Sequence, residues 1–295
     1  MSRKDLLDIE DIENELFSVD DRLHLLKHRF IALAMDYNHH IDSSFKEEKI
    51  YALRDQVQFR LFAAKFHLEL LFNHLLLAEK HIEQKQGMDL NAGAFRWQIT
   101  SLFDSFIYHT VSVFDYIGTL ANYISGTQKD KTLMWTQLAK SVRDKKNEFS
   151  KTSFSKVVDQ MDREFTCKLY DYRSSLIHRK ADIIESKVTY SPKPYRVTTT
   201  FFAGKHLIKS FKDLKVLSKE NDLTVKYVSL WILNKAIDNI TDMLFSLKEE
   251  IESKSKGKEP TMTFLHPETN ERLSASVRYW NEELYKQSKT VSNKS

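Results

Sequence analysis

The sequence predicts an all-α protein, an up-and-down antiparallel helical bundle with a small β-hairpin near residues 183–202. Three observations predict this class. The 295 residues include only 6 Gly and 4 Pro, whereas sandwiches, barrels and propellers need frequent turns. Leu, Lys, Glu and Phe, which suit long helices, are abundant. Apolar residues also recur with a helical period over long stretches.

The first half of the chain predicts long helices. Residues 1–42 have an acidic start and helically spaced apolar residues, which predict one or two helices. From Phe45 to about Gln86 a strong 3.6-residue pattern predicts one helix, which Gly87 is placed to end. Another long helix is predicted from Ala92 to about Ser125. The inward positions of the 45–86 helix are Ile50, Leu53, Val57, Leu61, Ala64, Leu68, Leu71, Leu75 and Ile82.

The second half mixes helices with one hairpin. A short helix is predicted at Leu133–Ser141, a long one from Phe154 to about Arg179, and a last one at Leu223–Ser253. Residues 183–202 are rich in Val, Ile, Thr and Tyr around a Pro-containing turn at Ser191–Pro194, which predicts the hairpin. The inward positions of the 154–179 helix are Val157, Val158, Met161, Phe165, Leu169, Leu176 and Ile177.

The chain is expected to form one domain with appended ends. Residues 1–43 are predicted as an acidic helical segment that packs on the bundle, and residues 44–255 as the bundle itself. Residues 256–295 are predicted as a polar linker and a C-terminal tail, part of which packs back because it carries Phe264, Tyr279 and Trp280.

Charge is distributed unevenly although the formal total is only +4. Residues 1–21 carry a net charge of −6, while residues 129–156 carry +5 and residues 186–226 carry +6. The basic segments are either ordinary solvated surface or a basic rim that attracts phosphate. Both interpretations stay open at this point.

Cysteine usage and hydropathy point to a soluble cytoplasmic protein without a membrane partner. The single cysteine, Cys167, excludes a disulfide scaffold and a Cys-built zinc site, and it fits a reducing cytosol. The N-terminal residues lack the apolar region of a secretory signal. The most apolar stretch, Leu68–Ala78, is too short to span a bilayer and contains Glu69 and His74.

The eleven histidines do not predict a metal site. His67, His74 and His81 share one helical face, but seven residues of helix separate neighbours by about 10.5 Å, which is too far for one ion. His24 and His28 have i, i+4 spacing without the glutamate of a zinc-protease motif. No metal and no cofactor are therefore expected.

A serine hydrolase and a nucleotide-binding loop are also disfavoured. Asp171, Ser175 and His178 fall on roughly one helical face, but no GxSxG turn and no oxyanion donors accompany them. Walker and dinucleotide fingerprints need glycines that this sequence lacks.

The segment Tyr170–Arg179 carries chemistry that suits metal-independent RNA cleavage. Arg173 is a permanent cation whose planar fork matches a phosphate. His178, at the end of the same helix, titrates near neutral pH and moves protons. An imidazole can deprotonate the 2′-hydroxyl or protonate the 5′-oxygen, while a guanidinium stabilises charge on the phosphate oxygens.

Helix geometry sets a condition on this pair. On a regular helix Arg173 and His178 lie about 140° apart around the axis and about 7.5 Å apart along it. They converge only if the helix distorts near its end, if Arg173 reaches around, or if a second subunit completes the site.

An Arg followed by four to six residues and a His, late in a bundle helix, resembles the signature of the HEPN superfamily. The resemblance covers Arg173–His178 directly and residues 45–255 in general shape. It implies a four- or five-helix bundle that forms a homodimer with two motifs in one cleft. It also implies RNA as the partner, no metal or cofactor, and a role in toxin–antitoxin or anti-phage systems.

The resemblance assigns catalysis to Arg173 and His178. Ser174 stands where the family often has Asn, and it can still donate a hydrogen bond. Family members carry an acidic residue that positions the arginine, and Asp104 matches that role because it interrupts an apolar run. The alternative is that Asp104 faces solvent.

Three further residues complete the predicted site. Asp171 is a second possible ion-pair partner of Arg173. Arg179 and Lys180 either extend a phosphate-binding surface or stabilise the C-terminus of the helix electrostatically.

The resulting hypothesis is a metal-independent endoribonuclease, a hydrolase in the broad sense, that leaves 2′,3′-cyclic phosphate and 5′-hydroxyl ends. The alternative is a non-catalytic HEPN-like module that binds RNA, nucleotides or a protein. An antitoxin or another protein is a further possible partner under either hypothesis.

Overall fold

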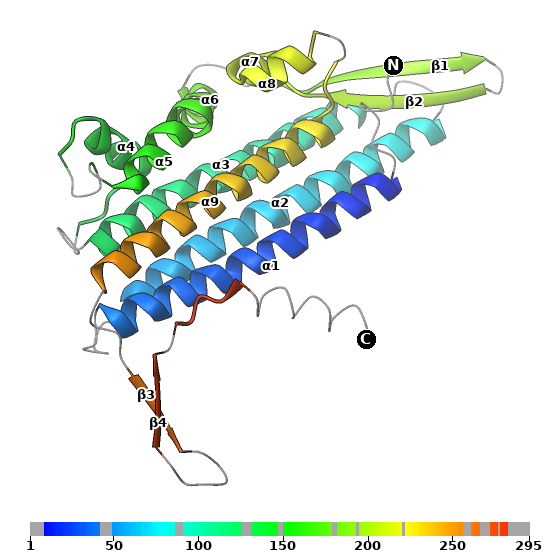
Figure 1. The fold of residues 1–295 in the computed structure, drawn as a ribbon. Coiled ribbons are helices and arrows are strands. Elements are labelled where there is room, and N and C mark those ends of the chain that lie inside the picture. The colour runs from blue at the N-terminus through cyan, green and yellow to red at the C-terminus, as the bar shows by residue number, and fades with distance from the viewer. Residues whose placement is uncertain are drawn as a thin grey trace. The chain divides into compact units, whose positions relative to one another are not determined.

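The chain folds into antiparallel helices with a small antiparallel hairpin, which confirms the predicted class (Figure 1). The structure is a computed structural model. It describes residues 9–41, 49–85, 91–125, 131–146, 150, 152–178, 182–192, 195–219, 222–255, 261–265, 272–276 and 278–282.

Four long helices follow the predicted ranges closely. They are α1 (Ile9–His40), α2 (Lys49–Lys85), α3 (Asn91–Ser125) and α9 (Val225–Lys254). All the inward residues predicted for the 45–86 helix are buried. Thr224 begins α9 by accepting a hydrogen bond from the backbone N–H of Tyr227 at 3.1 Å, as N-cap residues do. Gly87 lies outside the described residues.

The predicted 154–179 helix is interrupted by a π-helical turn. It consists of α5 (Ser153–Met161), the π-turn η2 (Asp162–Thr166) and α6 (Cys167–His178). A π-turn adds a residue to one turn and rotates everything after it. The prediction that Ile177 points inward is wrong: it is 60% exposed, because the last turn of α6 borders an open pocket rather than the core.

The remaining elements are short. The predicted helix near 133–141 is α4 (Trp135–Arg143), and the predicted hairpin pairs β1 (Glu185–Pro192) with β2 (Tyr195–Phe202). The sequence did not indicate α7 (Lys205–Ser210) and α8 (Lys212–Leu217). It also did not indicate a second antiparallel hairpin, β3 (Thr261–Leu265) with β4 (Arg272–Ser276).

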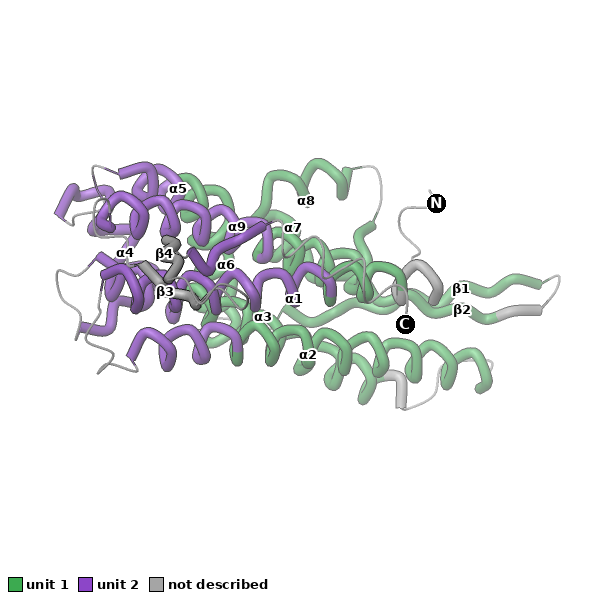
Figure 2. The backbone as a smooth tube through the Cα atoms, turned by 60° about the horizontal axis from the view of Figure 1, so that its bottom comes forward, with its two compact units in different colours: residues 1–20, 59–114, 160–236 green, residues 21–58, 115–159, 237–295 purple. Residues whose placement is uncertain are grey.

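The chain divides into two compact units, which Figure 2 colours separately. Unit 1 comprises residues 1–20, 59–114 and 160–236, and unit 2 comprises residues 21–58, 115–159 and 237–295. These boundaries differ from the three predicted ranges, 1–43, 44–255 and 256–295, which stay a prediction.

Aromatic rings fill the core of unit 1. The ring of Phe165, on the π-turn, lies 6.1 Å from Phe114 of α3, 5.7 Å from Phe211 and 6.1 Å from Trp231 of α9. The hairpin joins this unit through alternate buried residues of β2, among them Val197. The π-turn is thus fixed by the core and sets the rotation of α6.

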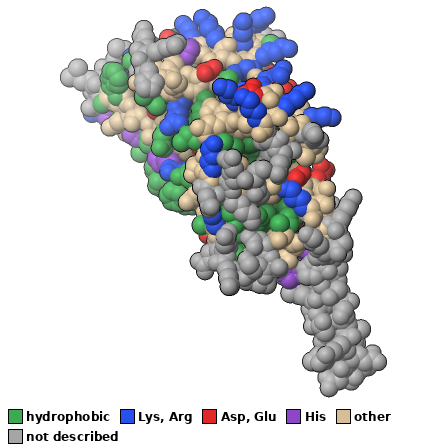
Figure 3. Space-filling model, turned by 90° about the vertical axis from the view of Figure 1, so that its left-hand side faces the viewer, with side chains coloured by type: hydrophobic (Ala, Val, Ile, Leu, Met, Phe, Trp, Pro, Cys, Tyr) green, Lys and Arg blue, Asp and Glu red, His purple; other side chains and the backbone are tan. Residues whose placement is uncertain are grey.

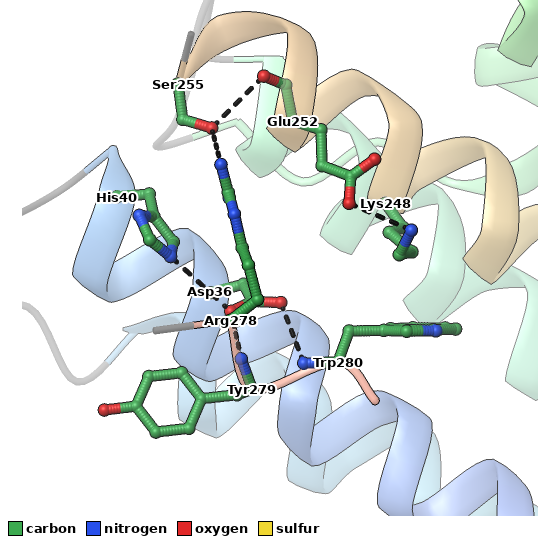
Figure 4. Close-up of polar contacts among 8 residues, drawn as sticks. All are labelled: Asp36, His40, Lys248, Glu252, Ser255, Arg278, Tyr279 and Trp280. Atoms are coloured by element: carbon green, nitrogen blue, oxygen red, sulfur yellow. Dashed lines mark hydrogen bonds and ion pairs between the residues drawn. The ribbon is translucent and has the colours of Figure 1, made fainter. Parts of the chain in front are cut away.

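In unit 2 the C-terminal segment docks on α1, as the tail was expected to do in part (Figure 4). The Asp36 carboxylate accepts hydrogen bonds from the backbone N–H groups of Tyr279 and Trp280, at 2.7 and 3.1 Å. The Trp280 ring is buried 5.5 Å from Phe245. Burial raises the pKa of Asp36, although the two backbone hydrogen bonds that it accepts and the nearby charge of His40 act in the opposite direction.

By length and composition α2 is apolar enough to cross a membrane, yet 44% of its most apolar window is buried in the protein. Core helices of soluble proteins meet the same criterion. The expectation of no membrane partner is therefore left as a prediction.

Candidate functional site

An open pocket lies between α3 and α6 in unit 1 and contains Arg173. Its volume is about 440 Å³. The pocket combines exposed aromatic rings with hydroxyl, carboxyl, imidazole and guanidinium groups, a mixture that suits a ligand with both flat rings and charge. Its lining residues are Trp97, Thr100, Ser101, Asp104, Ser105, Tyr108, His109, Arg173, Leu176 and Ile177.

Arg173 is held in this pocket by an aromatic ring. Its guanidinium carbon lies 4.6 Å from the centre of the Tyr108 ring, a cation–π contact worth about 1 kcal/mol at such a half-exposed place. Its Nε atom is buried without a hydrogen-bond partner, which costs about 1–3 kcal/mol. An anion that enters the pocket would find the Arg173 guanidinium already positioned, with its Nε–H donor available for a hydrogen bond.

Arg173 and His178 lie on one uninterrupted stretch of α-helix. α6 is regular from Cys167 to His178, and the π-turn precedes Arg173. Distortion of the helix end therefore does not bring the two side chains together, and the separation of about 140° stands. Arg173 and His178 can therefore meet at one phosphate only if the long arginine side chain reaches around the helix, or if a second subunit completes the site. The His178 side chain lies outside the described residues.

Asp104 lines the same pocket, but no ion pair within 4 Å joins it to Arg173 among the contacts of the described residues. Burial, and after it the charge of Asp182, raises the pKa of Asp104 to about 6. Its Oδ1 atom is buried and makes no hydrogen bond. A group with such a pKa is partly protonated near neutral pH, so it can give or take a proton in the pocket.

Asp182 ties the end of α6 to α7. Its Oδ2 accepts hydrogen bonds from the hydroxyl of Tyr172 at 3.4 Å and from the backbone N–H of Leu207 at 3.2 Å. Burial and this carboxylate raise the pKa of Tyr172, so its hydroxyl stays protonated and donates. A β-carbon on Gly204 would overlap the same carboxylate. Only glycine leaves room for the carboxylate there.

His109 is a pocket residue that sequence reasoning missed. Arg60 of α2 donates from Nη1 to its Nδ1 at 3.3 Å, so the ring carries its proton on Nε2. Burial, followed by the charges of His67 and Arg60, lowers the pKa of His109. The ring is thus a neutral hydrogen-bond donor. The sequence did contain a signal for this residue, since His109 follows Tyr108 in the same segment as Asp104.

The other predicted residues lie apart from this pocket or are not described. Ser174 and Asp171 are exposed on α6, and the Cys167 thiol lies 3.8 Å from Asp171 Oδ2. Arg179 and Lys180 lie outside the described residues.

The histidines considered for metal binding have other contacts. His67 Nδ1 donates to the carbonyl of Ala63 at 2.8 Å, and His74 Nε2 lies 2.7 Å from Gln98 Oε1. Over the described ranges, no group of three or more His, Cys, Asp or Glu is arranged to hold a metal ion.

A second pocket of about 330 Å³ lies between the β1–β2 hairpin and α7, and three lysines line it, Lys187, Lys205 and Lys209. Lys205 forms an exposed ion pair with Glu185 at 3.8 Å. Figure 3 shows Lys and Arg side chains gathered along the upper edge of one face. The lysines of this pocket belong to the basic segment 186–226.

Comparison of the chain with family models, curated proteins and solved structures gives no match. The fold and pocket therefore define a class only, a helical protein with a half-buried arginine in an open aromatic pocket. The resemblance to the HEPN superfamily rests on the Arg173–His178 motif and the helical architecture.

Proposed function

We propose that the protein is a metal-independent endoribonuclease of the HEPN type, in which Arg173 binds the scissile phosphate and His178 moves protons. One observation carries the proposal. Five residues before His178 on a regular helix, Arg173 presents an unpartnered Nε and a guanidinium fixed over Tyr108 in an open pocket. A guanidinium fixed before the reaction stabilises developing phosphate charge at little reorganisation cost.

The reaction needs only proton transfer and charge stabilisation. An imidazole takes the proton of the 2′-hydroxyl, whose oxygen attacks phosphorus and forms a 2′,3′-cyclic phosphate. The bond from phosphorus to the 5′-oxygen breaks, and a second imidazole, or the same one acting later, protonates that oxygen. In a homodimer, the His178 residues of two subunits supply a base and an acid.

The pocket also suits single-stranded RNA. Trp97 and Tyr108 are exposed beside Arg173, and exposed aromatic rings stack on unpaired bases. The lysines of the hairpin pocket add positive charge for neighbouring phosphates. Toxin–antitoxin or anti-phage defence is the biological setting that we propose from the family resemblance.

Cleavage is tested with purified protein and single-stranded RNA in excess EDTA. We expect fragments with 2′,3′-cyclic phosphate and 5′-hydroxyl ends, and no cleavage of DNA of the same sequence, which lacks the attacking hydroxyl. His178→Ala is expected to abolish cleavage. His81→Ala, which replaces a histidine outside the pocket on α2, is the matched control. Cleavage by His178→Ala at the parent rate would sink the assignment.

A non-catalytic RNA-binding module is the second candidate function, and His109 favours it. Burial, and after it the charges of His67 and Arg60, lowers the pKa of His109, so its neutral imidazole suits hydrogen bonding rather than proton transfer. This candidate predicts that RNA binds, that Arg173→Ala weakens binding, and that no fragments form.

A further inference from the structure

Two hydrogen-bonding groups in the pocket that contains Arg173 take no part in the proposed cleavage chemistry. They are Asp104 and His109. Asp104 is an acceptor whose Oδ1 atom is buried, and no described residue donates a hydrogen bond to that atom. His109 is a donor, because Arg60 donates to its Nδ1 atom and leaves the ring proton on Nε2. The pocket therefore offers a ligand one carboxylate and one neutral N–H group beside the guanidinium.

Asp104 lies in line with two exposed aromatic rings on α3, those of Trp97 and Tyr108. At 100° per residue the three positions fall within about 40° around the helix. Tyr108 is one turn, about 6 Å, from Asp104 along the axis. Side chains of a helix lean toward its N-terminus, which directs the Tyr108 ring toward Asp104. A flat ligand that stacks on the Tyr108 ring therefore has its edge within reach of the carboxylate.

Arg173 adds an anionic group to the description of the ligand. Its guanidinium carbon lies 4.6 Å from the centre of the Tyr108 ring, and a guanidinium stacks through its faces while its N–H groups donate in its plane. A permanent cation in the pocket disfavours a cationic ligand. The pocket volume of about 440 Å³ is in the range of small-molecule sites. The ligand that fits combines a flat ring, an anionic group and neutral donors on the edge of the ring.

A nucleotide meets these requirements, and a carboxylate selects guanine among the four bases of RNA. The Watson–Crick edge of guanine presents two adjacent donors, N1–H and N2–H, which one carboxylate accepts together. Adenine and cytosine present one donor beside an accepting ring nitrogen, and uracil presents one donor between two carbonyl oxygens. A carboxylate repels these acceptors, which adds discrimination against the three bases. Guanine also carries O6 beside N1–H, an acceptor that matches the Nε2–H group of His109.

The ionised form of Asp104 is the one that selects guanine. Burial, and after it the charge of Asp182, raises the pKa of Asp104 to about 6. Tyr172 and Arg173 of α6 and His109 of α3 are further titratable or charged groups near Asp104 or in the same pocket. Above its pKa the carboxylate accepts two hydrogen bonds, whereas the neutral acid offers one donor and one acceptor. The neutral acid thus matches the edges of adenine and cytosine instead.

We infer that this pocket binds a guanine nucleotide, with Asp104 accepting hydrogen bonds from N1–H and N2–H of the base and Arg173 binding the phosphate. The nucleotide is either free or a guanosine within single-stranded RNA, and the second source rests on the proposed function. This role of Asp104 differs from the one that the family resemblance implies, in which the acidic residue positions the arginine.

Calorimetric titration of the full chain with the four nucleoside 5′-monophosphates at pH 8 tests the selection. We expect GMP to bind most tightly. Inosine 5′-monophosphate, which lacks the N2 amino group, should bind about tenfold more weakly than GMP, because one hydrogen bond to a charged acceptor is lost. AMP, CMP and UMP should bind more weakly still, since each leaves the carboxylate facing an acceptor.

Three variants separate recognition of the base from recognition of the phosphate. In Asp104→Asn the amide offers one donor and one acceptor, so the preference for GMP over AMP should fall to about twofold or less. Arg173→Ala should weaken all four nucleotides by a similar factor, about tenfold, and keep their order. Asp213→Asn, at an exposed residue of α8, is the matched control and should keep both affinity and order. Circular dichroism checks that each variant is folded.

A second titration at pH 5 tests the same carboxylate without a substitution. The parent protein should lose most of its preference for GMP over AMP at this pH, whereas the ratio for Asp104→Asn should stay the same. The comparison uses a ratio of affinities, so the titration of the phosphate group, which all the nucleotides share, cancels.

The source of the nucleotide is tested with an RNA pentanucleotide of adenosines that has one central guanosine, and with the same RNA without the guanosine. A guanosine within RNA as the ligand predicts that the first oligonucleotide binds more tightly than GMP and than the second oligonucleotide. A free nucleotide as the ligand predicts that GMP binds more tightly than either.

The inference and the proposed function fail on different results. Equal binding of the four monophosphates, a guanine preference that survives in Asp104→Asn, or no measurable binding of GMP and of the guanosine-containing RNA would overturn the inference, whether or not RNA is cut. Selective binding of GMP through Asp104 by a protein that cuts no RNA would refute the proposed function and leave the inference standing.

Discussion

The Asp104→Asn substitution is expected to stabilise the protein at neutral pH. Burial, and then the charge of Asp182, raises the pKa of Asp104 from 3.8 to about 6, and its buried Oδ1 has no hydrogen bond that would offset this. The folded chain therefore binds the carboxyl proton of Asp104 more tightly than the unfolded chain does. Because of this tighter binding, protonated Asp104 stabilises the fold at low pH. This stabilisation is lost as the pH rises from about 4 through 6.

The magnitude follows from the shift. A difference of about two pKa units corresponds to about 3 kcal/mol. Because Asp104 is only half-buried, solvent screens its charge and about 1–2 kcal/mol is a better expectation. Asparagine keeps the shape without the charge. It should raise the free energy of unfolding by that amount at pH 8 and by about a third of it at pH 4.5.

Urea unfolding followed by circular dichroism at the two pH values measures this difference. Asp213→Asn, which replaces an exposed aspartate on α8, is the control and should change stability little at either pH. A loss of stability in Asp104→Asn at pH 8 would refute the reasoning. That loss is what a carboxylate paired with Arg173 would produce, so the same measurement tests the family-derived role of Asp104.

Two further predictions concern packing. Gly204→Ala is expected to lower the free energy of unfolding by about 2–3 kcal/mol, because the new β-carbon displaces Asp182. Gly93→Ala is the control and should not destabilise the protein, because a β-carbon at that position has no atom within 4 Å. If both substitutions lowered the urea midpoint equally, the steric argument would be contradicted. Trp280→Ala is expected to cost about 3 kcal/mol and to speed tryptic cleavage near Lys256, because it removes the buried ring of the docked segment. Unchanged tryptic cleavage would mean that the hydrogen bonds to Asp36 are enough to keep the C-terminal segment docked.

Helical periodicity predicted the long helices because a buried face repeats the same spacing over many turns. For α2 the predicted inward residues are all buried. The hairpin at 183–202 was predictable for a similar reason, since β-branched residues flank a Pro-containing turn. The π-turn at Asp162–Thr166 was not, because one added residue hardly alters the apolar pattern on either side.

The site was harder to predict than the fold, because it depends on contacts between distant segments. The sequence offered Asp104 as a partner of Arg173, whereas the described structure shows Tyr108 in contact with the guanidinium. The role of His109 depends on Arg60, which lies 49 residues earlier. The exposed phenylalanines of α2, Phe59, Phe62 and Phe66, were not foreseen, because the apolar period identifies the buried face of a helix and not the apolar residues outside that face.

Two unfavourable features meet in the pocket between α3 and α6, and their coincidence argues for a function there. Arg173 has a buried Nε without a partner and Asp104 a buried Oδ1 without one, and each costs folding free energy. Two unsatisfied polar atoms in one pocket oppose folding, so folding alone does not explain why both are there. A phosphate that accepts a hydrogen bond from Arg173 Nε would remove one of these costs.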